Sequence, residues 1–320
     1  MEVANPHPDV GRRSLVGTDR TTSVLGFVVR ASVAGAAEGE ERVVAALRQA
    51  RGRGVSTFQV PADPGAARAE RWLGLAFPSA DPDLIVLLDR SRESLSPQAP
   101  EGELREPALL DERLRKSLEV SATRLGPNAG MLVHWVGDDA EPAAQGEVAG
   151  VLEGLRRDGL IVGWVQGLRA DRAGPLEGIP ERATLFSCPL SLLDRRQIPA
   201  LSERAAHFPT AVFATDPLSA GRLDGSAFAA SVLDRRPGAG PAGVRELHRE
   251  FDPVIRLGFL TERRQRTLLQ AAISFELRWP WVCAVLLPVP SPERMEELLS
   301  AERTPPISDA ELSRIGEETS

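Results

Sequence analysis

The chain has 320 residues, of which 42% are hydrophobic and 26% are charged, and its formal net charge at pH 7 is −7. This composition is ordinary for a globular protein, and the length suffices for one large domain. The acidic balance argues against nucleic acid as a partner, because phosphate binding requires a basic surface. No run of about 18 apolar residues occurs, and the N-terminus lacks the apolar core of a signal peptide. We therefore expect a cytoplasmic protein without a membrane span.

Three residue types are scarce. Both cysteines, Cys188 and Cys283, lie among apolar residues and outside any CxxC or histidine-rich motif. This predicts two buried thiols and no metal site or disulfide. The chain contains no tyrosine, and Lys116 is its only lysine. The excess of arginine over lysine, together with abundant Ala, Gly and Pro, is typical of a GC-rich bacterial coding sequence.

The predicted elements alternate between strands and helices after a polar, Pro- and Gly-containing tail at residues 1–21. Apolar runs of strand length predict eight strands, at 24–29, 55–60, 84–88, 131–136, 160–165, 184–188, 211–214 and 282–287. Apolar residues at helical spacing predict helices, at 40–51, 66–76, 107–125, 145–157, 198–206, 262–277, 292–300 and 307–316.

Regular alternation of this kind predicts a parallel sheet covered by helices, and eight strands favour a closed (β/α)8 TIM barrel over an open sheet. Residues 222–254 break the pattern, since they are rich in Gly, Pro and Arg and lack periodicity. We expect a long loop there, after the seventh strand. The prediction is thus a flexible tail over 1–21 and a single domain over 22–320.

Several strings resemble a known family in their order and spacing. They are GVSTFQVPADPGAARAERWLGLAF at 54–77, SLEVSATRLGPNAGMLVHW at 117–135, PLSLLDR at 189–195, DPLSAGRL at 216–223 and SPERMEEL at 291–298. Together they resemble the aldo-keto reductases over residues 22–316. The resemblance implies a (β/α)8 barrel whose members reduce carbonyls with NADPH. It also implies a catalytic Asp, Tyr, Lys and His at the C-terminal rim of the barrel.

Three of these four catalytic positions hold other residues. The position of the Asp is Gln59, that of the Tyr is Pro64, and that of the Lys is Asp89. Only the His is kept, as His134. Lys116 lies in the helix before the fourth strand, where it cannot replace the missing lysine. The resemblance therefore implies a barrel without the proton donor of the family.

The cofactor positions have changed as well. Gly167 and Leu168 stand where the family binds the nicotinamide amide, Ser187 replaces a glutamine, and Thr215 replaces the aromatic residue that stacks on the nicotinamide. The turn after the eighth strand reads LPVP at 287–290, and proline lacks the N–H that phosphate sites use. We expect no cofactor, with NADPH only if the chain is a reductase with an unusual proton donor.

The remaining polar residues at the rim suggest acid–base chemistry. An Asp89–His134 pair would orient the imidazole and activate it as a base, and Gln59 could bind a ligand carbonyl. The alternatives are a rim hydrogen bond for His134 and a loop cap or an Arg90 pair for Asp89. We predict a substrate pocket walled by four further residues, although core packing is an alternative for the tryptophans: Trp135, Trp164, Gln166 and Arg90.

Two classes of function follow from these residues. The first is a non-redox enzyme that catalyses dehydration, isomerisation or cyclisation of a small molecule in a bacterial biosynthetic pathway. The second is a non-catalytic pseudo-reductase that acts as a binding or regulatory subunit. NADPH-dependent reduction is a third alternative. A protein partner or a homodimer is left open, because fold does not fix function.

Overall fold

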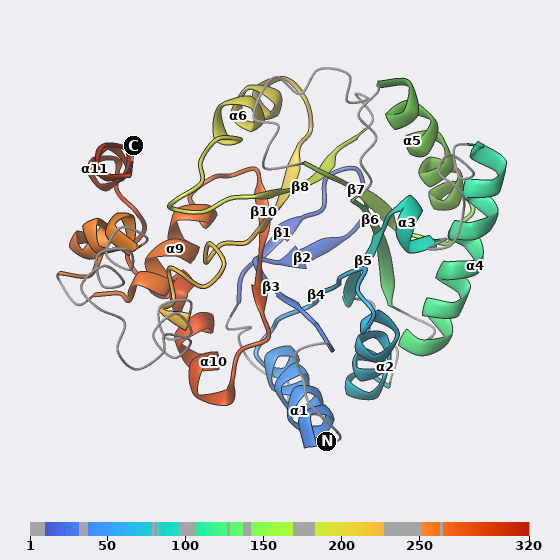
Figure 1. Cartoon of the computed structure of the whole chain (residues 1–320), viewed down its shortest axis with the longest axis horizontal. Helices are drawn as coiled ribbons and strands as arrows, with labels where there is room; N and C mark the ends of the chain where they lie inside the picture. The colour runs from blue at the N-terminus through green and yellow to red at the C-terminus, as the bar shows by residue number, and fades with distance from the viewer. Residues whose placement is uncertain are drawn as a thin grey trace, which may run out of the picture.

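The computed structural model describes residues 10–31, 38–78, 81, 83–95, 106–126, 129–136, 142–168, 183–226, 251–262 and 265–319. Within them, parallel strands close into a barrel in the order β10-β3-β4-β5-β6-β7-β8-β9 (Figure 1). This confirms the predicted (β/α)8 barrel. Its strands are β3 (Leu25–Val28), β4 (Thr57–Val60), β5 (Ile85–Arg90), β6 (Gly130–Trp135), β7 (Gly163–Gly167), β8 (Leu185–Pro189), β9 (Ala211–Thr215) and β10 (Val282–Pro288).

Helices surround this barrel on the outside (Figure 1). They are α1 (Glu38–Gly52), α2 (Ala66–Ala76), α3 (Arg92–Leu95), α4 (Pro107–Leu125), α5 (Pro142–Arg157), α6 (Ile198–His207), α9 (Leu268–Leu277), α10 (Pro292–Leu299) and α11 (Asp309–Glu318), with short 3-10 helices η2 (Leu257–Thr261) and η3 (Ala301–Arg303). Among the described residues, no helix is long and apolar enough to cross a membrane.

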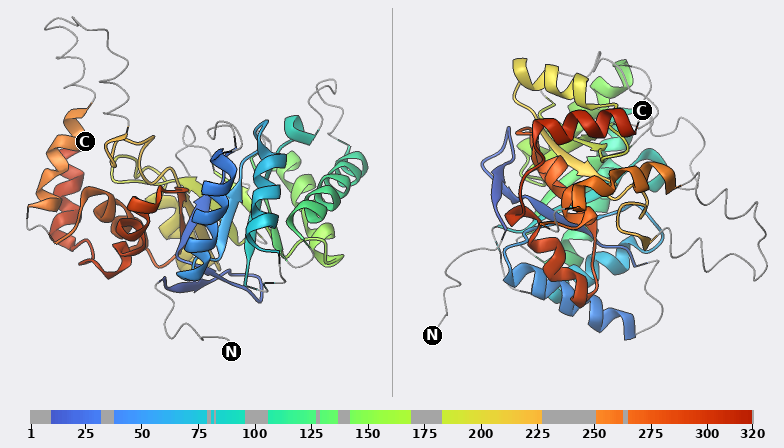
Figure 2. Two further views of the ribbon diagram at one scale, coloured as in Figure 1. Left: turned by 90° about the horizontal axis from the view of Figure 1, so that it is seen from below. Right: turned by 90° about the vertical axis from the view of Figure 1, so that its left-hand side faces the viewer.

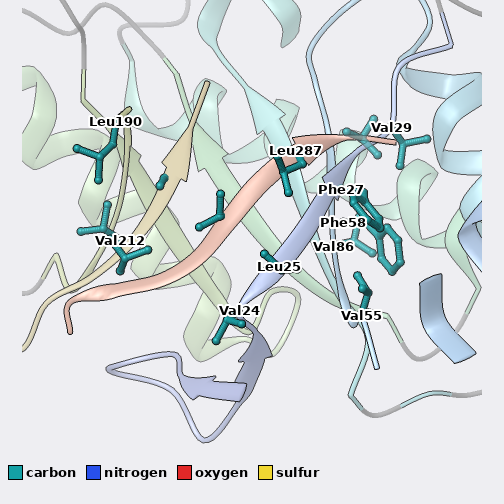
Figure 3. Close-up of a cluster of buried hydrophobic side chains, with 14 of the residues drawn as sticks. Val24, Leu25, Phe27, Val29, Val55, Phe58, Val86, Leu190, Val212 and Leu287 are labelled. Carbon is teal, nitrogen blue, oxygen red and sulfur yellow. The ribbon is translucent and has the colours of Figure 1, made fainter. Parts of the chain in front are cut away.

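Two apolar layers hold the barrel together, because successive side chains of a strand point to opposite faces. The inner layer fills the barrel and includes Leu87, Leu132 and Phe213. The outer layer packs between strands and helices. Figure 3 shows part of it, where Phe27 and Phe58 lie on the neighbouring strands β3 and β4.

The end of the barrel at which the strands begin is closed by an antiparallel hairpin of β1 (Arg12–Ser14) and β2 (Thr21–Ser23) (Figure 2). Leu15, at its tip, packs into the inner layer. The Arg13 guanidinium donates hydrogen bonds to the carbonyls of Trp279 and Leu277, at 3.0 and 2.8 Å. The prediction of a flexible tail is therefore wrong for residues 10–21, which form part of this hairpin and pack against the barrel. Residues 1–9 lie outside the described residues.

Two boundaries differ from prediction at the C-terminal half. The helix expected at 262–277 begins only at Leu268, because Thr267 and Gln270 form a reciprocal capping box. The loop expected at 222–254 lies outside the described residues at 227–250. Residues 251–256 are helical rather than loop, and the Phe251 side chain is buried.

Candidate functional site

Four polar side chains gather inside the barrel near the C-terminal ends of its strands. Gln59 lies on β4, Asp89 on β5, His134 on β6 and Ser187 on β8, and all four are buried. Asp89 and His134 are register partners on adjacent strands, so both point to the same face. The C-terminal end of the strands is where enzymes of this architecture build their active sites.

Hydrogen bonds join these side chains into one chain of contacts. His134 Nδ1 lies 2.7 Å from Asp89 Oδ1, and His134 Nε2 lies 2.5 Å from Ser187 Oγ. Gln59 Nε2 donates to the same Asp89 oxygen at 2.8 Å. A carboxylate oxygen accepts hydrogen bonds, so the contact with Asp89 favours the tautomer that carries its proton on Nδ1. The Nε2 lone pair is then free to accept the Ser187 hydroxyl hydrogen.

Gly167 makes the contact between His134 and Ser187 possible. It lies on β7, between the strands of the two residues, and it is the register partner of Ser187. A Cβ atom there would lie 2.8 Å from the backbone oxygen of Trp135 and 3.4 Å from His134 Nε2. The absence of a side chain thus lets His134 on β6 reach Ser187 on β8.

Replacing Gly167 by alanine is expected to destabilise the protein by about 1–3 kcal/mol, because the new methyl group overpacks against a backbone oxygen. It should also push His134 away from Ser187. Urea unfolding measures the first effect. Gly150→Ala is the matched control, since a Cβ there has no neighbour within 4 Å. That helix substitution should stabilise by about 0.5–1 kcal/mol, and equal effects of the two variants would contradict the packing argument.

Gln59 and His134 also line a cavity of about 1380 Å³. Its other walls come from α1, from the segment that follows β9 and from the segment that follows β10. Such a volume exceeds the roughly 300–1,000 Å³ of typical small-molecule sites. The cavity can therefore admit a sizeable ligand to the imidazole.

The cavity wall after β9 carries a carboxyl group, that of Asp216. Burial raises the pKa of this carboxyl above its ordinary value, although the N–H of Ala220 donates to it at 2.7 Å. Asp216 also has a positive φ of 50°, a backbone conformation that Asp adopts more readily than most residues. Thr215, at the end of β9, lines the same cavity.

None of the four residues predicted to wall the pocket lines this cavity. Arg90 donates instead to Ser117, Ser121 and Glu70 on the helices outside the barrel, at 2.9, 2.7 and 3.3 Å. The physical reason is strand alternation. Because Asp89 points inward, the next residue, Arg90, points outward.

The other three predicted pocket residues follow the same rule. Trp135 and Trp164 belong to the outer apolar layer, and the guanidinium of Arg92 lies 6.0 Å from the Trp135 ring. Gln166 is in register with Trp135 and Phe186, and its amide donates to the Gly167 carbonyl at 3.2 Å. The prediction of these pocket walls was therefore wrong.

The predicted rim residues behave differently. The structure brings Gln59, Asp89 and His134 together, whereas the sequence assigned Ser187 only to a changed cofactor position. Leu168 contributes its backbone N–H, which donates to the Ser187 carbonyl at 2.7 Å. No group of three His, Cys, Asp or Glu side chains that could hold a metal ion is found in the described parts of the chain.

Comparison with known proteins finds similarity in structure but not in sequence. No protein-family model matches the chain, and no curated protein matches it. Aldo-keto reductase AKR11C1 from Bacillus halodurans, in its holo form, has a TM-score of 0.65 at 17% identity, covering 97% of each chain. A thermostable aldo-keto reductase, Tm1743, in complex with the inhibitor epalrestat has a TM-score of 0.68 at 16% identity, covering 96% of this chain and 99% of that one.

An aldo/keto reductase from Klebsiella pneumoniae, in complex with NADP and acetate, has a TM-score of 0.65 at 17% identity, covering 93% of this chain and 91% of its own. Identities this low establish the architecture and not the activity. Over nearly its whole length, the chain therefore has the closed (β/α)8 barrel fold of the aldo-keto reductases.

Proposed function

We propose that this chain is a member of the aldo-keto reductase superfamily that catalyses a non-redox acid–base reaction on a small molecule. Dehydration, isomerisation and cyclisation are the reactions that fit. One observation carries the proposal, the 2.7 Å contact between His134 Nδ1 and Asp89 Oδ1 inside the barrel rim. A lysine at position 89 would not orient the imidazole in this way.

The proposed chemistry uses His134 as the group that moves a proton. Asp89 fixes the Nδ1–H tautomer and stabilises the imidazolium that forms when Nε2 takes a proton. Gln59 holds the Asp89 carboxylate through its amide N–H. Because His134 lines the cavity, a substrate bound there can give its proton to the imidazole.

The residues at the cofactor positions do not fit NADPH well. Gly167 offers no side chain to a nicotinamide amide, and the Ser187 hydroxyl is already bound to His134. Pro288 and Pro290 line the cavity without an N–H, and Asp216 adds a carboxyl group that would repel phosphates. With no tyrosine in the chain, the family's proton donor is also missing.

The wider role rests on composition and fold alone. We place the reaction in a bacterial biosynthetic pathway in the cytoplasm, with a small-molecule substrate. A non-catalytic binding subunit and an NADPH-dependent reductase are the competing functions, and the experiments below separate them.

Elimination of 5-nitrobenzisoxazole tests the base directly, because this reaction needs only proton removal in a pocket. His134→Ala is expected to lose about 10²-fold or more of the rate, and Asp89→Asn about 10-fold. The control is His207→Ala, which removes an exposed histidine on α6 and should change nothing. A rate for His134→Ala equal to that of the unmodified protein would reject His134 as a base.

Titration with NADPH, followed by its fluorescence, separates the alternatives. Micromolar binding would favour the reductase. Failure to bind NADPH, combined with no base-dependent elimination, would favour the pseudo-reductase that acts as a binding subunit. Elimination that depends on His134, without NADPH binding, is the result that the proposed function requires.

A further inference from the structure

We propose that Ser187 is a nucleophile activated by His134 and Asp89, and that the site transfers small acyl groups from esters. This inference rests on the proposed function, because it uses the same base. It adds a covalent step and a substrate class, which is esters of short, unbranched carboxylic acids.

The three side chains are hydrogen-bonded in the order of a Ser-His-Asp catalytic triad. Ser187 Oγ lies 2.5 Å from His134 Nε2, and the opposite ring nitrogen, Nδ1, lies 2.7 Å from Asp89 Oδ1. A base within hydrogen-bond distance of the hydroxyl, itself oriented by a third group, is the arrangement that activates a serine. The three residues come from three different strands, β8, β6 and β5, so the rigid barrel fixes their spacing.

Other buried serines have different partners. Ser191 is bound to the hydroxyl of Ser219, and Ser121 donates to Glu70. Among the described residues, Ser187 is the serine whose hydroxyl contacts a histidine ring nitrogen. The adjacent thiol of Cys188 does not compete, because burial raises its pKa to about 12 and strand alternation turns it to the outer layer.

The chemistry balances without a cofactor. Ser187 Oγ attacks the ester carbonyl carbon and gives its proton to His134 Nε2. The carbon–oxygen bond to the alcohol then breaks, and the imidazolium returns that proton to the leaving alcohol. Water, deprotonated by the same imidazole, releases the acid and restores the serine.

Burial restricts the substrate. Ser187 is only 3% exposed, and His134 and Gln59 are 5% and 6% exposed. His134 and Gln59 line the cavity and Ser187 does not, so an ester must approach the hydroxyl past these two side chains. A long or branched acyl chain is hindered there more than an acetyl group. We therefore expect acetyl esters to react faster than esters of longer or branched acids.

The test is reaction with p-nitrophenyl acetate, quenched in acid, followed by peptide mass spectrometry. The background is low, because the chain has one lysine and no tyrosine to be acetylated. Acetyl is expected on Ser187 in the unmodified protein, with p-nitrophenolate released in proportion. Acetylation confined to other residues would overturn the proposal without requiring any variant.

Variants separate this inference from the proposed function. Ser187→Ala should abolish acetylation but keep elimination of 5-nitrobenzisoxazole, since His134 remains. Asp89→Asn should slow acetylation by about 10²-fold or more. Ser274→Ala, which removes another buried serine hydroxyl, is the control and should react normally. Unchanged cleavage of p-nitrophenyl acetate by Ser187→Ala would reject Ser187 as the nucleophile while leaving His134 as a base. Loss of both reactions in His134→Ala is the result that both proposals require.

Discussion

Replacing Glu70 by alanine is expected to lower the free energy of unfolding by about 3–5 kcal/mol, because it leaves a buried guanidinium without its charge partner. Glu70 on α2 is 1% exposed and lies 3.3 Å from Arg90 Nη2 and 2.7 Å from Arg124 Nη1. It also accepts the hydroxyl hydrogen of Ser121 at 2.8 Å. Burial already lowers the pKa of Arg90 below its ordinary value, and the Glu70 charge opposes that effect.

Urea unfolding of Glu70→Ala and Glu153→Ala compares a buried ion pair with an accessible one. Glu153 pairs with Arg156 on the surface of α5, where removal should cost about 0–1 kcal/mol. Glu70→Gln keeps the shape and the hydrogen-bonding oxygen, and should fall between the two. If Glu70→Ala costs no more than Glu153→Ala, the buried network of Glu70 with its hydrogen-bond partners contributes no more to the free energy of unfolding than a surface pair.

This network also supports the site, since Arg90 directly follows Asp89. The Arg90 side chain fastens the end of β5 to α2 and α4, while the Asp89 side chain meets His134 inside the barrel. Loss of Glu70 should therefore slow the His134-dependent elimination as well as destabilise the fold. An unchanged rate would show that β5 holds Asp89 without this anchor.

The barrel was predictable because the sequence patterns that specify its strands and helices are local. Apolar runs of strand length and helical spacing recur along the chain, and β–α alternation admits few topologies. The hairpin of β1 and β2 was not predictable in this way. Its short strands carry polar side chains, and their partners, such as Leu277 and Trp279, lie more than 250 residues away in the sequence.

The site was predictable only in part. Family resemblance located Gln59, Asp89 and His134, but the pocket walls required the face on which each side chain lies. Once His134 is assigned to the inside, alternation alone assigns Trp135 to the outside. Ser187 could not be paired with His134 from the sequence, because the contact crosses β7 and depends on the missing side chain of Gly167.

The second large effect concerns the buried carboxyl group of Glu276. It lies on α9, is 0% exposed, and neither of its carboxylate oxygens has a hydrogen-bond partner among the described residues. Burial raises its pKa well above the ordinary value, and the nearby Asp216 raises it further. An unpaired charge there would be costly, so burial favours the protonated form of Glu276 in the folded protein.

The sign of the pH dependence follows from proton binding. Above the ordinary pKa of a glutamate, the unfolded chain releases this proton while the folded protein keeps it. The folded state then binds more protons, so stability falls as the pH rises. The loss is at most about 1.4 kcal/mol for each pH unit, and it ends once the pH exceeds the folded pKa. Below the unfolded pKa, the group has no effect.

Glu276→Gln and Glu276→Leu should therefore gain stability relative to the unmodified protein as the pH rises to 7–8. This pH-dependent part of the difference should vanish as the pH falls towards the ordinary glutamate pKa. Urea unfolding at several pH values measures this. Glu153→Gln is the opposite control, because hydrogen bonds from Arg156 lower the pKa of Glu153. Its effect should be a loss of stability at neutral pH that disappears in acid. A difference for the Glu276 variants that stays constant across pH would mean that this carboxyl does not titrate differently in the folded and unfolded states, and that its burial acts only through packing.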